Sequence, residues 1–130
     1  MVDERPVDER PVDARPVDAA DDPVISVDRL ARALTIKDHP TVRVERGLAL
    51  QSIGRYAEAI VDYTDALARP GADHDLLLYR RGQCHARIGA LRAARRDLIA
   101  CAELGGPHAF AAMNALGRLY RSLGAAFETG

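Results

Sequence analysis

The chain has 130 residues, 48% of them hydrophobic, and its 18 lysines and arginines nearly balance its 19 aspartates and glutamates. This length allows one domain at most, and the near-neutral charge gives no overall bias toward nucleic-acid or membrane partners. The sequence shows neither the roughly 18 consecutive apolar residues of a membrane span nor the apolar core of a signal peptide. Because Cys84 and Cys101 also lack metal-ligand spacing, we expect a cytoplasmic protein with reduced thiols and no metal or other cofactor.

The N-terminal region is a low-complexity repeat. Residues 2–21 read VDERP, VDERP, VDARP and a decayed VDAAD, so each unit has a single valine together with two or three charged residues. Such units bury too little apolar surface to offset the entropy of ordering. We predict that residues 1–23 form a disordered acidic tail and residues 24–130 the folded domain. Ten acidic and 6 basic side chains give residues 1–40 a charge of −4, whereas 4 acidic and 8 basic give residues 75–130 a charge of +4.

A short helix is predicted over residues 26–35. Ser26 can cap its N-terminus. Val27, Leu30 and Leu34 share one face at helical spacing, so the helix has an apolar stripe to bury. Pro40 ends the segment, because the residue before a proline avoids the α region.

From residue 40 onward the sequence repeats with a period of 35. Positions that obey this spacing are Gly47, Gly82 and Gly117; Gly54, Gly89 and Gly124; Ile53, Ile88 and Leu123; Ala59 and Ala94; and Ala66 and Cys101. A fixed period in this range is typical of stacked supersecondary units. We predict a first unit at 40–70 with helices 40–52 and 56–68. A second unit at 73–105 has helices 73–87 and 91–103, and a single terminal helix covers 108–124.

The residues G-x-x-x-x-x-x-G-x-Y-x-x-A-I-x-x-Y-x-x-A-L, from Gly47 to Leu67, resemble the tetratricopeptide repeat. The second unit keeps Gly82, Gly89, Leu91, Ala94, Leu98 and Cys101, and the third keeps Tyr120 beside its two glycines. The resemblance covers about two-thirds of the chain. It implies an all-α fold of antiparallel helix pairs, here an α-solenoid of about two and a half repeats. Since at least three repeats are normally needed for stability, either the helix at 26–35 caps one end or the last helix meets another molecule.

Two features of the first helices call for a structural reason. Glycine in the middle of a helix costs about 1 kcal/mol relative to alanine, so we expect Gly47, Gly82 and Gly117 each to let a neighbouring helix approach closely. Arg46 and Arg81 stand where the tetratricopeptide family usually has an apolar residue. We expect their aliphatic stems to lie along the helix while the guanidinium groups reach solvent.

No pattern in the sequence indicates catalysis. His39 and His74 fit capping or turn positions. His85 fits a core position, and His108 begins the last helix. No two histidines have metal-ligand spacing, the two cysteines replace alanines of the first unit, and no base is placed beside a nucleophile. We therefore expect that the protein is not an enzyme.

The resemblance also implies a binding site. In tetratricopeptide domains the first helices line a concave groove that holds an extended peptide or a partner helix. Here that groove would contain Val44, Leu48 and Gln51 from the first unit, Tyr79, Gln83 and Arg87 from the second, and Asn114, Arg118 and Arg121 from the terminal helix. This stripe is apolar at one end and cationic at the other. We expect a scaffold or adaptor whose protein or peptide partner has an apolar anchor and acidic residues.

Two other functions stay open. One is a nucleic-acid- or phosphate-binding surface formed by Arg87, Arg92, Arg95 and Arg96, although no aromatic residues are interleaved with them and the chain is near neutral. The other is a structural oligomerisation unit. The terminal helix lacks a covering partner, so a weak homodimer could form through its apolar residues Phe110, Met113, Leu116, Leu119, Tyr120, Leu123 and Phe127. Nucleic-acid binding should fall steeply with salt concentration, whereas an apolar-anchored peptide should resist salt.

Overall fold

A computed structural model describes residues 22–129 of the chain, with side chains described through Gly124, and within this range all regular structure is helical. The helices are α3 (Pro23–Ile36), α4 (Pro40–Ser52), α5 (Tyr56–Leu67), α6 (His74–Arg87), α7 (Leu91–Leu104) and α8 (Ala109–Thr129). The predicted all-α class is confirmed. The predicted disorder of the acidic tail concerns residues that, apart from Asp22 and Pro23, lie outside the described range.

Helix α3 begins three residues earlier than the sequence analysis expected. Its N-cap is Asp22, whose side chain accepts a hydrogen bond from the backbone N–H of Val24 at 2.9 Å, and Pro23 occupies the first turn. Proline suits this position because its missing N–H would have no partner inside the helix. Ser26 therefore lies within the helix and does not cap it. The other helices begin within a residue of their predicted positions, and α8 continues beyond the predicted end to Thr129.

Two turns between helices depend on glycine. Gly54 after α4 and Gly89 after α6 have φ angles of 83° and 82°, in the left-handed region. The next residue then folds back: Arg55 N–H donates to the carbonyl of Leu50 at 2.9 Å, and Ala90 N–H donates to that of His85 at 2.8 Å. The last carbonyls of both helices are thereby satisfied. The 35-residue spacing of these glycines thus corresponds to two turns of the same kind.

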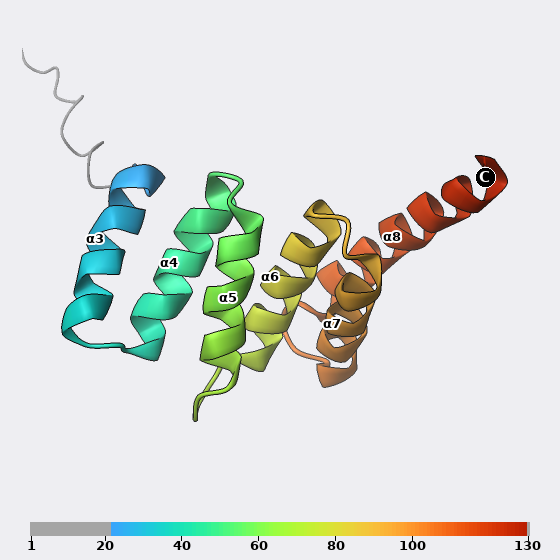
Figure 1. Ribbon diagram of the computed structural model, residues 1–130. Helices are drawn as coiled ribbons and strands as arrows, with labels where there is room; N and C mark the ends of the chain where they lie inside the picture. Colours follow the sequence, from blue (N-terminus) through green and yellow to red (C-terminus); the bar gives the residue numbers. More distant parts are fainter. Residues whose placement is uncertain (1–21, 130) are drawn as a thin grey trace, which may run out of the picture.

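Successive helices lie against one another in chain order. Each helix from α3 to α7 packs on the one that follows it, and α6 also touches α8. Figure 1 shows the helices in a row with alternating directions, from α3 at one end to α8 at the other, where the C-terminal part of α8 projects away. Because successive helices alternate in direction, α4, α6 and α8 run the same way. Helices α4 and α6 are the first helices of the hairpins α4–α5 and α6–α7.

The buried side chains form two clusters. The first is built around α4 and α5 and contains Val27, Leu50, Ala59, Tyr63, Ala66, Leu77 and Cys84. The second joins α7 to α8 and contains Ala94, Leu98, Cys101, Ala112, Leu116 and Leu119. Both are rich in alanine and cysteine, and such small side chains let helices pack closely. Neither cluster contains a cavity-filling tryptophan, since the chain has none.

The expected close approach is present at two of the three mid-helix glycines. A Cβ atom added at Gly47 would lie 2.6 Å from Cε1 of Tyr63, and one at Gly82 would lie 2.9 Å from Cγ of Leu98. At Gly117 the nearest atom is Nη1 of Arg121, 3.7 Å away. The expectation was wrong at Gly117, because within the described residues no helix follows α8 to pack against it.

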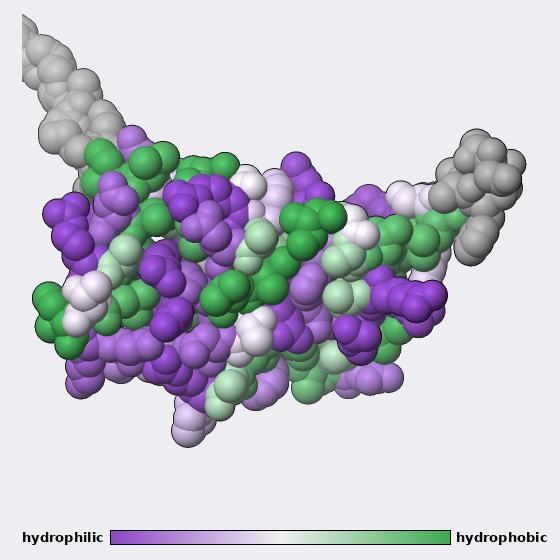
Figure 2. Space-filling view, in the orientation of Figure 1, coloured by the Kyte–Doolittle hydropathy of each residue, from purple (hydrophilic) through white to green (hydrophobic). Residues whose placement is uncertain are grey.

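The exposed apolar surface is smaller on α8 than the sequence suggested. Leu116 and Leu119 are buried against α7, and the exposed large side chains are Phe110, Met113 and Tyr120. The side chain of Phe127 lies outside those described. Figure 2 shows further hydrophobic surface at both ends of α3, where Val24 and Ile25 and then Ile36 are exposed. Across residues 22–129, no helix combines the length and apolarity needed to cross a bilayer.

Candidate binding groove

In each of the hairpins α4–α5 and α6–α7, one ion pair with a buried carboxylate links the first helix to the second. Arg46 on α4 donates from Nε and Nη2 to the two carboxylate oxygens of Asp62 on α5, at 2.8 and 2.7 Å. Arg81 on α6 does the same to Asp97 on α7, at 2.7 Å for both bonds. The side chain of Asp62 is fully buried and that of Asp97 is 7% exposed. We expected the guanidinium groups to reach solvent; instead, each is held by a buried carboxylate that requires a cation, and the arginine side chains are only 24% and 22% exposed.

Two more arginines and two more aspartates extend these ion pairs. We call the whole set the charged seam; its members are Arg43, Arg46, Arg69, Arg81, Asp38, Asp62, Asp65 and Asp97. Arg43 donates to Oδ1 of Asp62 at 3.2 Å and to both carboxylate oxygens of Asp38, at 3.1 and 2.9 Å. Hydrogen bonds from Arg43 lower the pKa of Asp38 to about 2. Arg69 joins Asp38 and Asp65 at 3.0 and 2.7 Å. The arginines of this seam are therefore neutralised within the fold.

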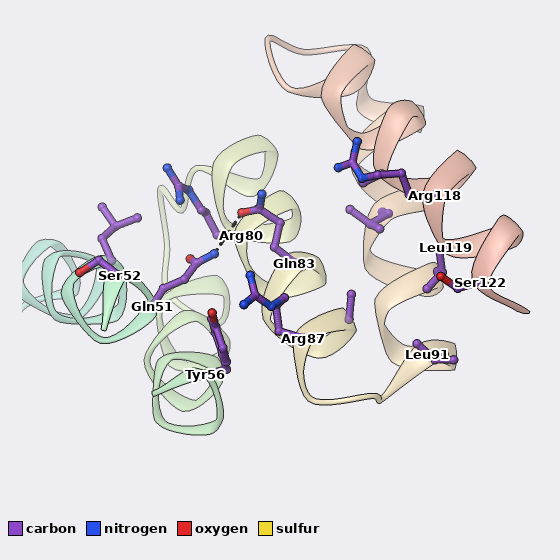
Figure 3. Close-up of a pocket in the computed structure, with 14 residues that line it drawn as sticks. Gln51, Ser52, Tyr56, Arg80, Gln83, Arg87, Leu91, Arg118, Leu119 and Ser122 are labelled. Carbon is purple, nitrogen blue, oxygen red and sulfur yellow. Dashed lines mark hydrogen bonds between the residues drawn. The ribbon is translucent and has the colours of Figure 1, made fainter. Parts of the chain in front are cut away.

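A separate concavity of about 550 Å³ lies among α4, α6 and α8 (Figure 3). We call it the groove. It is lined by Leu48, Gln51, Ser52, Tyr56, Arg80, Gln83, Ala86, Arg87, Leu91, Leu98, Ala115, Arg118, Leu119 and Ser122. Tyr56 and Leu91 are the first residues of α5 and α7, so the starts of the second helices close one end of the groove.

A chain of hydrogen bonds crosses the groove from α5 to α6. The hydroxyl of Tyr63 donates to Oε1 of Gln51 at 2.8 Å, and Nε2 of Gln51 donates to Oε1 of Gln83 at 3.1 Å. Nε2 of Gln83 in turn donates to the hydroxyl of Tyr79 at 3.0 Å. Burial raises the pKa of Tyr63, which keeps its hydroxyl protonated as the first donor. Each amide uses one of its two N–H groups in this chain, so each has one left to donate.

Among the described residues, the groove lining has three arginines and no acidic side chain. Arg80, Arg87 and Arg118 surround the same space as the two glutamines, and none of them forms an ion pair with any described residue (Figure 3). The guanidinium carbon of Arg87 lies 4.9 Å from the ring centroid of Tyr56, a cation–π contact that fixes its position. The Nε of Arg80 is buried without a hydrogen-bond partner. These charges contrast with the neutralised arginines of the seam.

The start of α8, and with it Arg118, is held against α6 by one carboxylate. Asp75 accepts hydrogen bonds from the backbone N–H of His108 at 3.1 and 3.2 Å and from the His108 ring. Burial alone would raise the pKa of Asp75, but the hydrogen bonds from His108 outweigh it and lower the pKa. The His108 ring also stacks on Tyr79, with centroids 5.1 Å apart. His108 thus fastens α8 beside the hydrogen-bond chain.

The structure brings together five of the nine residues expected in the groove. These are Leu48, Gln51, Gln83, Arg87 and Arg118. Tyr79 is not among the lining residues, although it receives the last hydrogen bond of the chain. Val44 lines a different concavity of about 400 Å³, with Pro40, Ala66 and the turn at Pro70 and Gly71, because it lies one turn nearer the start of α4.

Asn114 and Arg121 do not line the groove. The face that α8 presents consists of Ala115, Arg118, Leu119 and Ser122, at i, i+3, i+4 and i+7 spacing. Asn114 and Arg121 lie about a quarter turn around the helix from this face and are exposed. The groove is also lined by Tyr56, Leu91 and Arg80, which were not predicted from the sequence. Tyr56 and Leu91 are 35 residues apart, so the period itself carried a signal for them.

The other arginine cluster lies on a different face of α7. Arg92, Arg95 and Arg96 border a shallow depression of about 360 Å³ together with Ile99, Ala100 and Glu103. No aromatic side chain lines it, and no described acidic residue pairs with these arginines. We call this set of three arginines the α7 patch.

The buried thiols and histidines are not arranged for covalent chemistry. Burial raises the pKa of Cys84 to about 11 and raises that of Cys101, so both thiols stay protonated at neutral pH. Burial lowers the pKa of His85, whose Nε2 lies 3.7 Å from Oδ2 of Asp97. Within the part of the chain that the structure describes, no three His, Cys, Asp or Glu side chains gather as a metal site would require.

Comparisons with known proteins do not add to this description: no family model, curated protein or solved structure matches the chain.

Proposed function

We propose that residues 24–130 form a tetratricopeptide-like helical repeat module, a non-catalytic scaffold or adaptor of the cytoplasm that binds a peptide along its groove. Two pairs of contacts 35 residues apart support the repeat. Gly47 meets Tyr63 as Gly82 meets Leu98, and Arg46 pairs with Asp62 as Arg81 pairs with Asp97. Equivalent positions make equivalent contacts in both units, which is what a stacked repeat requires.

The observation that carries the peptide-binding proposal is the unbalanced charge of the groove. Three arginines line it without an acidic partner among the described residues, whereas Arg43, Arg46 and Arg81 are neutralised elsewhere in the fold. Arginine pairs bidentately with carboxylates, so the groove favours a ligand with acidic residues. Leu48 and Leu91, both partly exposed, provide apolar surface for an anchoring side chain beside the charges.

The glutamines supply a third kind of contact. The remaining N–H groups of Gln51 and Gln83 can donate to carbonyl oxygens of an extended peptide backbone. Because the two side chains are hydrogen-bonded to each other, their amide groups are already oriented before a ligand arrives. The ligand class is therefore an extended peptide with an aliphatic anchor flanked by aspartate or glutamate.

Selection from a library of random 12-residue peptides tests this proposal. Peptides enriched on the full chain should combine aliphatic and acidic residues. Calorimetry of one such peptide should show binding that Arg87→Ala with Arg118→Ala weakens about 5–100-fold, the equivalent of roughly 1–3 kcal/mol. Arg95→Ala with Arg96→Ala is the matched control, since it removes the same charge from the α7 patch.

Two results would overturn the groove as the binding site. One is enrichment of peptides without acidic residues. The other is equal weakening by both double variants, each shown by circular dichroism to be folded. A 20-nucleotide single-stranded RNA serves as the probe for the nucleic-acid alternative. Salt-sensitive RNA binding that depends on the α7 patch would favour that alternative over the peptide.

The exposed apolar face of α8 favours a second candidate function, a structural oligomerisation unit. Phe110 and Met113 are 71% and 52% exposed, and Gly117 beside them meets no side chain of another helix. A helix from a second molecule could pack there as α5 packs on Gly47. Sedimentation of the full chain tests this idea, as set out in the Discussion.

A further inference from the structure

We propose that the groove binds the N-terminal VDERP repeats of the same chain. This inference rests on the proposed peptide-binding function and names an occupant for the site. Residues 2–16 contain three successive units with a valine followed by Asp-Glu or Asp-Ala. Each unit matches the ligand that the groove favours, an aliphatic side chain beside carboxylates. Because the unit occurs three times, any one of three segments of the same chain can occupy the groove.

The charges of the two partners are complementary. Residues 1–21 contain seven acidic side chains (Asp3, Glu4, Asp8, Glu9, Asp13, Asp18 and Asp21) and three arginines, so their net charge is −4. The groove contains three arginines and no acid in its lining. Arg43, Arg46 and Arg81 are already paired with carboxylates and so compete poorly for the segment, whereas the α7 patch has no such pairs and is the site against which the groove is compared in the test below.

The segment emerges at a suitable place. Helix α3 begins at Pro23, and in Figure 1 its start lies at the top of the row, on the same side as the end of α4, whose last residue, Ser52, lines the groove. At about 8–10 Å between neighbouring helices, α6 lies roughly 20–30 Å from α3. A chain of 21 residues spans up to roughly 70 Å when extended, so VDERP units can reach the groove without unfolding α3.

Because the segment is tethered to the domain, even a weak contact can give high occupancy of the groove. A partly exposed arginine–carboxylate pair contributes little by itself. A tether of this length keeps the segment at an effective concentration on the order of millimolar. Even a unit with millimolar intrinsic affinity would therefore occupy the groove for a large part of the time. An external peptide must then displace the segment, so the chain regulates its own binding site.

Paramagnetic broadening in the full chain tests this docking. A nitroxide is attached at Ala14→Cys, which replaces neither a valine nor an acidic residue of the units and labels selectively because Cys84 and Cys101 are buried and their pKa values are raised. At roughly 20 mM salt the amide signals of Gln83 and Ala86 should lose about half their intensity or more. They should recover at roughly 500 mM salt, where the screening length falls to a few ångströms. Arg87→Ala with Arg118→Ala should also restore them, whereas Arg95→Ala with Arg96→Ala should not.

Several outcomes would overturn the proposal. These are no broadening at low salt, broadening confined to the α7 patch, and broadening that survives the groove variant. Transfer of the effect from a labelled molecule to an unlabelled, isotope-enriched one would show docking between molecules and would overturn docking within one chain. If a library-selected peptide still binds the groove while the segment does not, only this inference fails. If neither binds, the proposed function fails with it.

Discussion

Gly47 and Tyr63 lie in direct contact across α4 and α5: a methyl group at Gly47 would stand 2.6 Å from Cε1 of the tyrosine ring. The ring is fully buried, and its hydroxyl is held by Gln51, so it cannot move aside. Gly82 has the same relation to Leu98. The cost of glycine within a helix is therefore offset by closer packing at two positions, while Gly117 has no such contact.

The three glycines should respond differently to alanine. Gly47→Ala and Gly82→Ala should each destabilise the fold by about 1–3 kcal/mol, because overpacking outweighs the gain in helix propensity. Gly117→Ala should stabilise the fold by up to about 1 kcal/mol, since its Cβ meets only Nη1 of Arg121 at 3.7 Å. Urea unfolding of the three variants measures these differences. A loss of stability at Gly117 similar to the other two would show that its face is covered.

Breaking the ion pair between Arg81 and Asp97 should destabilise the fold. Asp97→Ala leaves the guanidinium of Arg81 partly buried with Thr64 as its remaining side-chain hydrogen-bond partner, so we expect a loss of about 2–4 kcal/mol in chemical unfolding. Arg81→Met combined with Asp97→Leu removes both charges and should recover most of that loss. The control is Glu58→Ala, which breaks the exposed pair with Arg55 at 2.6 Å and should cause no measurable change. A double variant no more stable than Asp97→Ala would contradict this account.

The stability of the fold should decrease in mild acid partly because of His85. Burial lowers its pKa, so the unfolded chain binds a proton before the folded chain does. The stabilisation is complete above the unfolded pKa, near 6.5, and is lost as the pH falls through the lowered folded value. His85→Leu should flatten the change in unfolding free energy between about pH 7 and pH 5. His74→Gln, at an exposed histidine, is the control, and an unchanged slope in His85→Leu would refute the assignment.

The apolar face of α8 should support weak self-association. The full chain should show concentration-dependent sedimentation at high micromolar concentration, and Phe110→Asp with Met113→Asp should make it monomeric. Both side chains are exposed, so the substitutions should not unfold the chain. Val61→Asp, at another exposed apolar side chain of α5, should leave association unchanged. A strictly monomeric parent chain would rule out the homodimer.

The position of the groove could be predicted from the sequence only in part. The resemblance to the tetratricopeptide repeat assigned Leu48, Gln51, Gln83, Arg87 and Arg118 to one groove, and all five line the same concavity. It also assigned Asn114 and Arg121, which the rotation of α8 turns away. That rotation is set by the buried contacts of Leu116 and Leu119 and by the hydrogen bonds between Asp75 and His108. The hydrogen bonds between Asp75 and His108 join residues 33 positions apart, and neither they nor the packing of Leu116 and Leu119 on α7 leaves a local pattern in the chain.

The sequence by itself determined the helices, their order and the spacing of their turns, because apolar periodicity, capping residues and turn glycines act over a few neighbouring residues. It also marked Gly47 and Gly82 as sites of close packing. Only the tertiary structure decided which charges are neutralised. Arg46 and Arg81 looked solvent-exposed, yet each meets a carboxylate 16 residues away, while Arg87 and Arg118 meet none among the described residues. The physical reason is that an ion pair depends on the separation of two groups in space, which helix packing sets.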